Sequence, residues 1–343
     1  MDLTFVSTGK RIGLHPDSEQ AVLEMPVWQR HAAYHDTCRK VYAMANPEVS
    51  APETVLAKRG VDLVRGSLTR EHAASLSNEI TNLLEARGPG GGAHGPITDN
   101  PDEVSVRVPY EGALLDMLKD ALPLILNPEA EGLLESYYGS YFRIDSTSCN
   151  RTHPIDEHTI SFLWHRDVAP MAQVHIMVYL TDSGPQKGLT LFLDLEQTKT
   201  AAKLGYHYTK VTQKRGLKRD DEGVPERRLH LDDLFEQAGK DLTVNRPDPK
   251  AGDSLLFAAP RVLHRGSLPT EGYRDVFLLV LQPSFVPWRQ DIEDFGYDHI
   301  FTDCGKDTLY TNPFKSLAPA LPKDGNSTLT SWEQWIFEGD ILP

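Results

Sequence analysis

The stretch Phe162–Pro170, FLWHRDVAP, places a histidine and an aspartate two residues apart, at the end of an apolar run and before a turn. Side chains two residues apart on a β-strand point to the same face. A strand here would therefore project the His165 imidazole and the Asp167 carboxylate together from one wall. A surface salt bridge at a strand end is the alternative interpretation, because the pattern His-x-Asp arises easily by chance.

The sequence around this stretch predicts a mainly β protein with antiparallel strands. Short runs rich in β-branched and aromatic residues begin at about Tyr137, separated by Gly, Pro, Asp and Ser. Many short strands with hairpin-length turns indicate a sandwich or barrel, and the jelly roll is the closed form that fits best. The runs are Tyr141–Ile144, Ile160–Trp164, Val174–Leu180, Leu189–Leu193, Asp253–Phe257, Val262–His264 and Val276–Leu281.

Helical patterns lie in the N-terminal part of the chain. Residues 15–50 and 69–87 are predicted as helices, the second with Thr69 as its N-cap and apolar residues at helical spacing. A further helix is expected from Gly112 to Leu126, bent or ended by Pro123.

These patterns predict one α+β structural unit with three parts. They are an N-terminal helical region (1–136) packed on the barrel, a β core (137–290), and a C-terminal extension (291–343). Residues 195–251 interrupt the β core and are strongly charged, so they are expected to be too polar to bury a core of their own. A solvated insertion and a lid over a substrate are both open interpretations of this segment.

The composition limits the classes of partner. The chain has 35 Lys and Arg against 49 Asp and Glu, a formal net charge of −14, which argues against nucleic acids and anionic membranes. A small-molecule substrate is the simplest expectation, with the protein a monomer or homodimer. We identify no signal peptide and no membrane span, and the three widely spaced cysteines suit a reducing cytoplasm.

A third candidate ligand turns the His-x-Asp pair into a possible metal site. His264 lies on a later β-run, near the end of the barrel pattern. Two histidines and one carboxylate form the facial triad that binds non-haem Fe(II) and leaves coordination positions open. The sequence therefore predicts His165, Asp167 and His264 as metal ligands, with no catalytic residue beyond them.

A co-substrate in the open positions would need an anchor. Arg274 lies ten residues after His264 and begins the next predicted strand. If residues 262–265 and 274–282 pair as a hairpin, the guanidinium lies beside the metal wall. There it would bind the distal carboxylate of a dicarboxylate through two hydrogen bonds.

The order and setting of these residues resemble those of the Fe(II)/2-oxoglutarate-dependent dioxygenases. Within them, the chain is similar to the phytanoyl-CoA dioxygenase family over about residues 60–285. The resemblance rests on the metal and arginine positions and on three segments, which are Arg65–His72 (RGSLTREH), Trp164–Asp167 (WHRD) and Tyr179–Asp182 (YLTD).

This resemblance implies a double-stranded β-helix, the cupin-like jelly roll. It also implies Fe(II), 2-oxoglutarate and O2, with release of CO2 and succinate during hydroxylation of a small molecule. Thr190 is similar to a strand threonine that contacts 2-oxoglutarate in some relatives. Where members carry Pro-Gly-Ser-His, this chain has Leu193–Glu196, so the resemblance does not extend to the substrate. The carboxylate of Asp167 argues against the family's halogenating relatives.

Weaker candidates and two other functions remain open at this point. His175, Arg143, Trp164 and Tyr141 are candidates for lining the pocket, with packing as the alternative role for each. A cupin-type metal enzyme that does not use 2-oxoglutarate would need no anchor at Arg274. A non-catalytic jelly-roll binding protein would take up no iron.

Overall fold

The computed structural model describes residues 5–8, 11–14, 16–47, 53–87, 105–154, 162–167, 169–206, 230–301 and 313. The helices are α1 (Pro16–Leu23), α2 (Val27–Ala45), α3 (Val55–Arg59), α4 (Arg70–Arg87), α5 (Gly112–Ile125), α6 (Pro128–Tyr138), α7 (Leu195–Lys203), α9 (His230–Gln237) and α10 (Trp288–Phe295). None of the helices in these ranges is long and apolar enough to cross a membrane.

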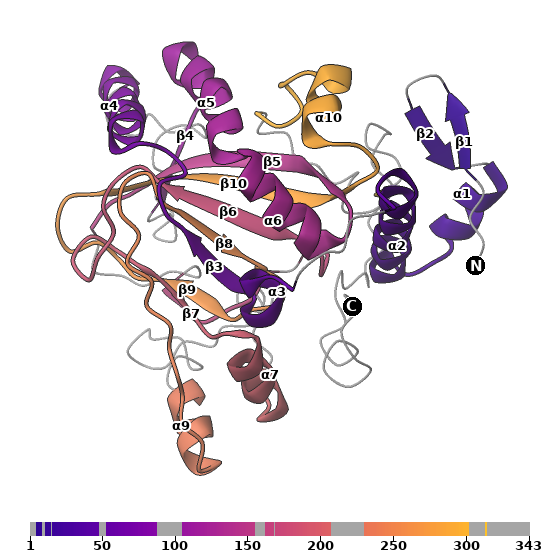
Figure 1. Cartoon of the computed structure of the whole chain (residues 1–343). Coiled ribbons are helices and arrows are strands. Elements are labelled where there is room, and N and C mark those ends of the chain that lie inside the picture. Colours follow the sequence, from indigo (N-terminus) through magenta and orange to yellow (C-terminus); the bar gives the residue numbers. More distant parts are fainter. Residues whose placement is uncertain are drawn as a thin grey trace.

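The strands form one large antiparallel sheet and two small ones (Figure 1). The six-stranded sheet has the order β3-β8-β6-β10-β5-β4, while β7 pairs with β9 and β1 with β2. The prediction of a mainly antiparallel β protein with helices is confirmed. The strands are β1 (Phe5–Thr8), β2 (Arg11–Leu14), β3 (Val61–Val64), β4 (Ser105–Val108), β5 (Tyr141–Thr152), β6 (Val174–Tyr179), β7 (Thr190–Phe192), β8 (Ser254–Phe257), β9 (His264–Gly266) and β10 (Arg274–Ser284).

One face of the six-stranded sheet, here called the outer face, packs against helices. Figure 1 shows α4, α5 and α6 covering it. Alternate residues of β10, such as Phe277, Leu279 and Leu281, join the large apolar core beneath these helices. The period of two in a β-strand sends the residues between them to the opposite face. The predicted packing of N-terminal helices on one sheet is therefore confirmed.

The opposite, inner face of the sheet looks toward the small β7–β9 sheet. The ring of Phe257 on β8 lies 5.1 Å from that of His264 on β9. The hydroxyl of Tyr179 on β6 lies 2.9 Å from that of Thr190 on β7. A second apolar cluster fills part of this space. Two layers of strands thus face each other across the residues that the sequence singles out.

Several local predictions are corrected. The helix predicted over 15–50 is two helices, because Pro26 lacks the N–H that a continuous helix needs and instead precedes α2. Helix α5 continues past Pro123 to Ile125. Helix α6 was missed, although Asn127 caps it through two backbone N–H groups and Pro128 occupies its first turn.

Two strand predictions near the site are wrong. Phe162–Trp164 form a short 3-10 turn and bends rather than a strand, while the preceding residues 160–161 lie outside the described part. Residues 262–265 and 274–282 do not pair as a hairpin. Strand β9 pairs with β7, whereas β10 lies between β5 and β6 in the large sheet. Sequential strands here enter different sheets, which local periodicity does not reveal.

The ends of the 195–251 insertion bury more apolar surface than its composition suggests. Helices α7 and α9 contribute to a third apolar cluster, which includes Ala201, Tyr206, Leu231 and Phe235 and reaches Leu263 beside β9. The expectation that this segment has no core is therefore wrong at its two ends. Residues 207–229, where a lid would lie, are outside the described part.

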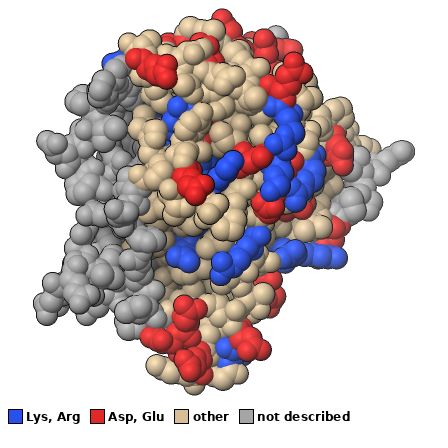
Figure 2. Space-filling model, turned by 90° about the vertical axis from the view of Figure 1, so that its left-hand side faces the viewer, with Lys and Arg blue, Asp and Glu red and all other residues tan. Residues whose placement is uncertain are grey.

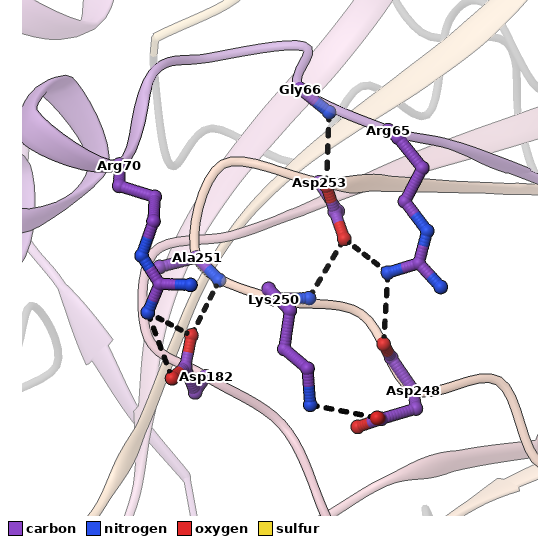
Figure 3. Close-up of polar contacts among 8 residues, drawn as sticks. All are labelled: Arg65, Gly66, Arg70, Asp182, Asp248, Lys250, Ala251 and Asp253. Carbon is purple, nitrogen blue, oxygen red and sulfur yellow. Dashed lines mark hydrogen bonds and ion pairs between the residues drawn. The ribbon is translucent and has the colours of Figure 1, made fainter.

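A polar network ties the loop before α4 to the segment before β8 (Figure 3). Asp253 accepts hydrogen bonds from the backbone N–H groups of Gly66 and Lys250 and from Arg65. Burial would raise the pKa of Asp253, but these bonds hold it below its ordinary value. Figure 2 shows basic and acidic side chains interleaved on the described part of the left-hand face of Figure 1. The basic groups drawn in Figure 3 are each already paired with an acid or a backbone oxygen.

Candidate metal centre

The structure brings the three predicted ligands together. One ligand atom each from His165, Asp167 and His264 lies within 4.8 Å of the other two. Both histidines are buried, and the Asp167 side chain is 19% exposed. Among the described residues these three form the one cluster of acidic, histidine or cysteine side chains with metal-ligand spacing.

Backbone pairing holds the two histidines side by side. The N–H of His165 donates to the carbonyl of His264 at 3.0 Å, and the N–H of His264 donates back at 2.8 Å. Their ring centroids lie 4.3 Å apart. Asp167 is placed by its own N–H, which donates to the carbonyl of Ala259 after β8. A pair of backbone bridges, rather than the predicted short strand, therefore positions the two histidines.

The hydrogen bonds of the two rings select the tautomer that a metal needs. Nδ1 of His165 lies 2.7 Å from the carbonyl oxygen of Leu163, and Nδ1 of His264 lies 3.1 Å from that of Val262. A carbonyl can only accept, so each Nδ1 carries the proton and each Nε2 keeps its lone pair. Backbone carbonyls orient metal-bound histidines in this way. The donor set, two imidazole nitrogens and one carboxylate, thus fits a divalent transition metal.

A third histidine lies next to this cluster. Nδ1 of His175 is 3.7 Å from an oxygen of Asp167, and its Nε2 is 3.1 Å from the side-chain oxygen of Gln173. The ring also packs edge-on against Phe257. His175 therefore faces the inner side of the sheet beside the candidate ligands, as a neighbour of Asp167.

Arg274 is a buried cation without an acidic partner in the described part of the chain. It begins β10 on the inner face and is 6% exposed. Its one hydrogen bond to a described residue runs from Nη1 to the carbonyl of Leu189 at 3.3 Å, and Nε has no partner. No carboxylate among the described residues pairs with it, and burial lowers the pKa of its guanidinium. Burying a charge without a counter-charge is strongly unfavourable, so this position favours an anionic ligand.

The residues around Arg274 include one that the sequence analysis missed. The Tyr179 hydroxyl contacts Thr190 and lies within electrostatic range of Arg274. Thr190 also donates to the sulfur of Met177 at 3.6 Å. In the sequence, Tyr179 stands out only as part of the YLTD segment at the end of a strand. Its position in β6, in register with Val276 two residues after Arg274, brings it here.

The inner face between Arg274 and His175 is partly open. Three rows of paired residues cross β5, β10 and β6 on this face. The members of the middle row, Ser148, Leu278 and Met177, are partly exposed, whereas the β10 and β6 members of the two neighbouring rows are buried. Partly exposed side chains therefore lie on the inner face between Arg274 and His175. The rows across β5, β10 and β6 are Asn150–Val276–Tyr179, Ser148–Leu278–Met177 and Ser146–Val280–His175.

Two weaker candidates have packing contacts. Trp164 lies 5.3 Å beneath the guanidinium of Arg265 and joins the third apolar cluster. Tyr141 packs edge-on against Tyr42 and accepts a hydrogen bond from Asn46, both at the end of α2. These contacts account for both side chains without a ligand.

No protein-family model and no curated protein matches the chain. Among solved structures, it is similar to the non-heme alpha ketoglutarate dependent epimerase SnoN from nogalamycin biosynthesis, with 17% identity over 73% of this chain and 84% of that one, and a TM-score of 0.42. It is also similar to apo EctD from S. alaskensis (17% identity, 69% and 79% covered, TM-score 0.46). HygX from Streptomyces hygroscopicus, with nickel and 2-oxoglutarate bound, is 14% identical (68% and 87% covered, TM-score 0.39).

Proposed function

We propose that this protein is an Fe(II)- and 2-oxoglutarate-dependent oxygenase that hydroxylates a small molecule, with release of CO2 and succinate. The observation that carries the proposal is the buried guanidinium of Arg274, which has no acid among the described residues and lies on the inner face that looks toward the His-Asp-His cluster. A metal site alone would not require this cation. A metal site with a dicarboxylate co-substrate would.

In this proposal His165, Asp167 and His264 hold Fe(II) and leave an open side for ligands. When bound, the iron supplies the activation of O2 that no amino-acid side chain provides. The chain orients the two imidazoles through backbone carbonyls, so that little rearrangement is needed on metal binding.

The other end of the inner face would hold the co-substrate. Arg274 receives the distal carboxylate of 2-oxoglutarate through its planar fork, with the hydroxyls of Tyr179 and Thr190 beside it. The keto-acid end then lies toward the candidate ligands, over the partly open row of the sheet. Buried apolar side chains around this row exclude water from the reacting groups.

The fold we propose is a double-stranded β-helix, formed by the inner face of the large sheet and the β7–β9 pair. The resemblance to the phytanoyl-CoA dioxygenase family is kept as part of this proposal. A cupin-type metal enzyme without 2-oxoglutarate is less well supported, because it leaves Arg274 buried without a role. A non-catalytic binding protein would likewise leave the preset histidine tautomers unexplained.

Anaerobic titration tests the proposal directly. We expect the purified protein to bind one Fe(II), and the Fe(II)-loaded protein to bind 2-oxoglutarate. His165→Ala, Asp167→Ala and His264→Ala should each lose Fe(II) binding while keeping the fold by circular dichroism. His299→Ala is the matched control, because His299 contacts Asp291 far from the cluster in sequence and should leave metal binding unchanged. Iron binding without any 2-oxoglutarate binding would favour the cupin-type alternative, and binding of neither would favour the non-catalytic one.

A further inference from the structure

A second buried guanidinium lies at the opposite end of the inner face from Arg274. Arg143 pairs with Gln282 across β5 and β10. The next pair, Ile144 and Leu281, belongs to the core under the helices. Because successive residues of a strand alternate between faces, Arg143 and Gln282 point to the inner side.

No described residue satisfies this guanidinium. Arg143 is 6% exposed, and no hydrogen bond or ion pair joins it to any residue in the described ranges. Its neighbour is the ring of Tyr34, 5.4 Å from the guanidinium carbon. An arginine carries five N–H donors, and leaving such donors buried without acceptors is costly. The position therefore favours a ligand with oxygen acceptors.

Two carboxylates lie within electrostatic range without contacting Arg143. Burial by itself lowers the pKa of Arg143, but the charges of Tyr34, Asp291 and Asp145 raise it by more, so its pKa lies above the ordinary value and the group stays charged. The same two acids would repel a second negative charge more strongly than a first. A monoanion with a flat pair of oxygens, a carboxylate, fits this setting better than a phosphate dianion.

The distance from Arg143 to the candidate metal centre suits a small molecule. Gln282, its cross-strand partner, is two residues along β10 from Val280, or about 7 Å. Val280 pairs with His175, whose ring lies 3.7 Å from Asp167. Arg143 and His175 lie on β5 and β6, on either side of β10, which adds about 10 Å across the sheet. A small molecule that spans roughly 12 Å of the sheet could therefore contact Arg143 and still reach the candidate ligands.

Helix α2 lies at this end of the large sheet. It supplies Tyr34 and contacts β5 and β10, and Figure 1 shows it across the end of the sheet where β5 begins and β10 ends. It precedes residues 60–285, to which the family resemblance applies. The environment of Arg143 is thus built partly from a segment that lies outside this resemblance.

We propose that Arg143 binds a carboxylate of the molecule that is oxidised, so that the substrate is a small monocarboxylic acid. This inference rests on the proposed function and deepens it. The two arginines would divide the inner face, with Arg274 for the co-substrate and Arg143 for the substrate.

Equilibrium binding tests the inference without turnover. The protein is loaded with Mn(II) and 2-oxoglutarate under nitrogen, then titrated calorimetrically with butyrate, 3-phenylpropionate and proline, each compared with its primary amide. We expect at least one acid to bind at least tenfold more tightly than its amide. Arg143→Gln and Arg143→Met should abolish this preference, and Arg143→Lys should keep part of it. Arg59→Gln, which removes an exposed arginine bonded to Asn245, is the matched control.

The outcomes separate this inference from the proposed function. Failure of the wild-type protein to bind Mn(II) or 2-oxoglutarate would count against the proposed function itself. Normal binding of both, with acids and amides bound equally or no acid bound, would overturn the role of Arg143. A preference for acids that survives in whichever Arg143 variant folds would overturn it as well.

Discussion

Arg151 and Arg274 lie on neighbouring strands, one residue pair apart, yet they point to opposite faces of the sheet. On the outer face, Arg151 donates to both oxygens of Asp275 at 2.8 and 2.7 Å and to Thr81 at 2.9 Å. Its guanidinium also lies 3.7 Å from the ring of Tyr273. On the inner face, Arg274 makes one hydrogen bond of 3.3 Å to a carbonyl.

This difference separates a cation that is satisfied within the protein from one that has no acidic partner among the described residues. Asp275 is fully buried and also accepts a hydrogen bond from Ser77 of α4, so the outer pair is satisfied within the protein. Arg274 is about as buried but has no acid in the described ranges. Because a buried charge needs a counter-charge, the first arrangement joins sheet to helix, and the second favours an external anion.

The largest expected effect is on stability, from Arg151→Met. The substitution leaves Asp275 buried with a serine hydroxyl but no cation, and the free energy of unfolding should fall by about 3–5 kcal/mol. Chemical denaturation measures this change. Arg65→Met is the control, because Arg65 is 58% exposed and Asp253 keeps its backbone hydrogen bonds. That variant should lose no more than about 1 kcal/mol. Equal losses in the two variants would contradict a structural role for the outer pair.

The next effect is on ligand binding, from Arg274→Ala. Removing the cation leaves the distal carboxylate of 2-oxoglutarate unpaired, at a cost of about 2–5 kcal/mol, or roughly a 30-fold or greater loss of affinity. Titration of the metal-loaded variant measures it. Fe(II) affinity should stay nearly unchanged, and Arg274→Lys should recover only part, since an ammonium lacks the fork. Wild-type affinity for 2-oxoglutarate in Arg274→Ala would remove the co-substrate assignment.

A double substitution sharpens the contrast between the faces. Removing both charges of the outer pair, in Arg151→Met/Asp275→Leu, should return the free energy of unfolding to within about 2 kcal/mol of the wild type. The remaining deficit comes from the lost Ser77 and Thr81 contacts. A double-mutant cycle yields the coupling between the two residues. Additive losses would show that the two side chains stabilise the protein independently.

The smallest expected effect is from Tyr179→Phe. It removes one hydroxyl beside Arg274, so 2-oxoglutarate affinity should fall by about two- to tenfold, which corresponds to one neutral hydrogen bond. Tyr42→Phe is the matched control, because its hydroxyl donates to Glu135 at 2.8 Å on the helical side. The same titration is applied to both variants. An equal loss of 2-oxoglutarate affinity in Tyr42→Phe would show that the loss in Tyr179→Phe is a general packing effect.

Much of the site followed from local sequence. The metal-ligand types and the position of Arg274 at the start of a strand depend on neighbouring residues, and the structure brings His165, Asp167 and His264 together. The predicted strand before His165 did not contribute, because backbone bridges to His264 hold that residue instead. The start of helix α6 is also encoded locally, because an Asn N-cap followed by Pro, here Asn127–Pro128, is a recognised signal for the start of a helix. Whether the three side chains hold iron stays a prediction.

The sequence by itself determined how side chains alternate along a strand and which residues carry side chains of metal-ligand type, because these properties depend on backbone period and side-chain chemistry. Only the tertiary structure decided that β9 and β10 enter different sheets, and that Tyr179 meets Thr190. It also decided that Arg151 has an acidic partner 124 residues away while Arg274 has none among the described residues. Such pairings depend on how distant strands pack together, which no local pattern in the chain encodes.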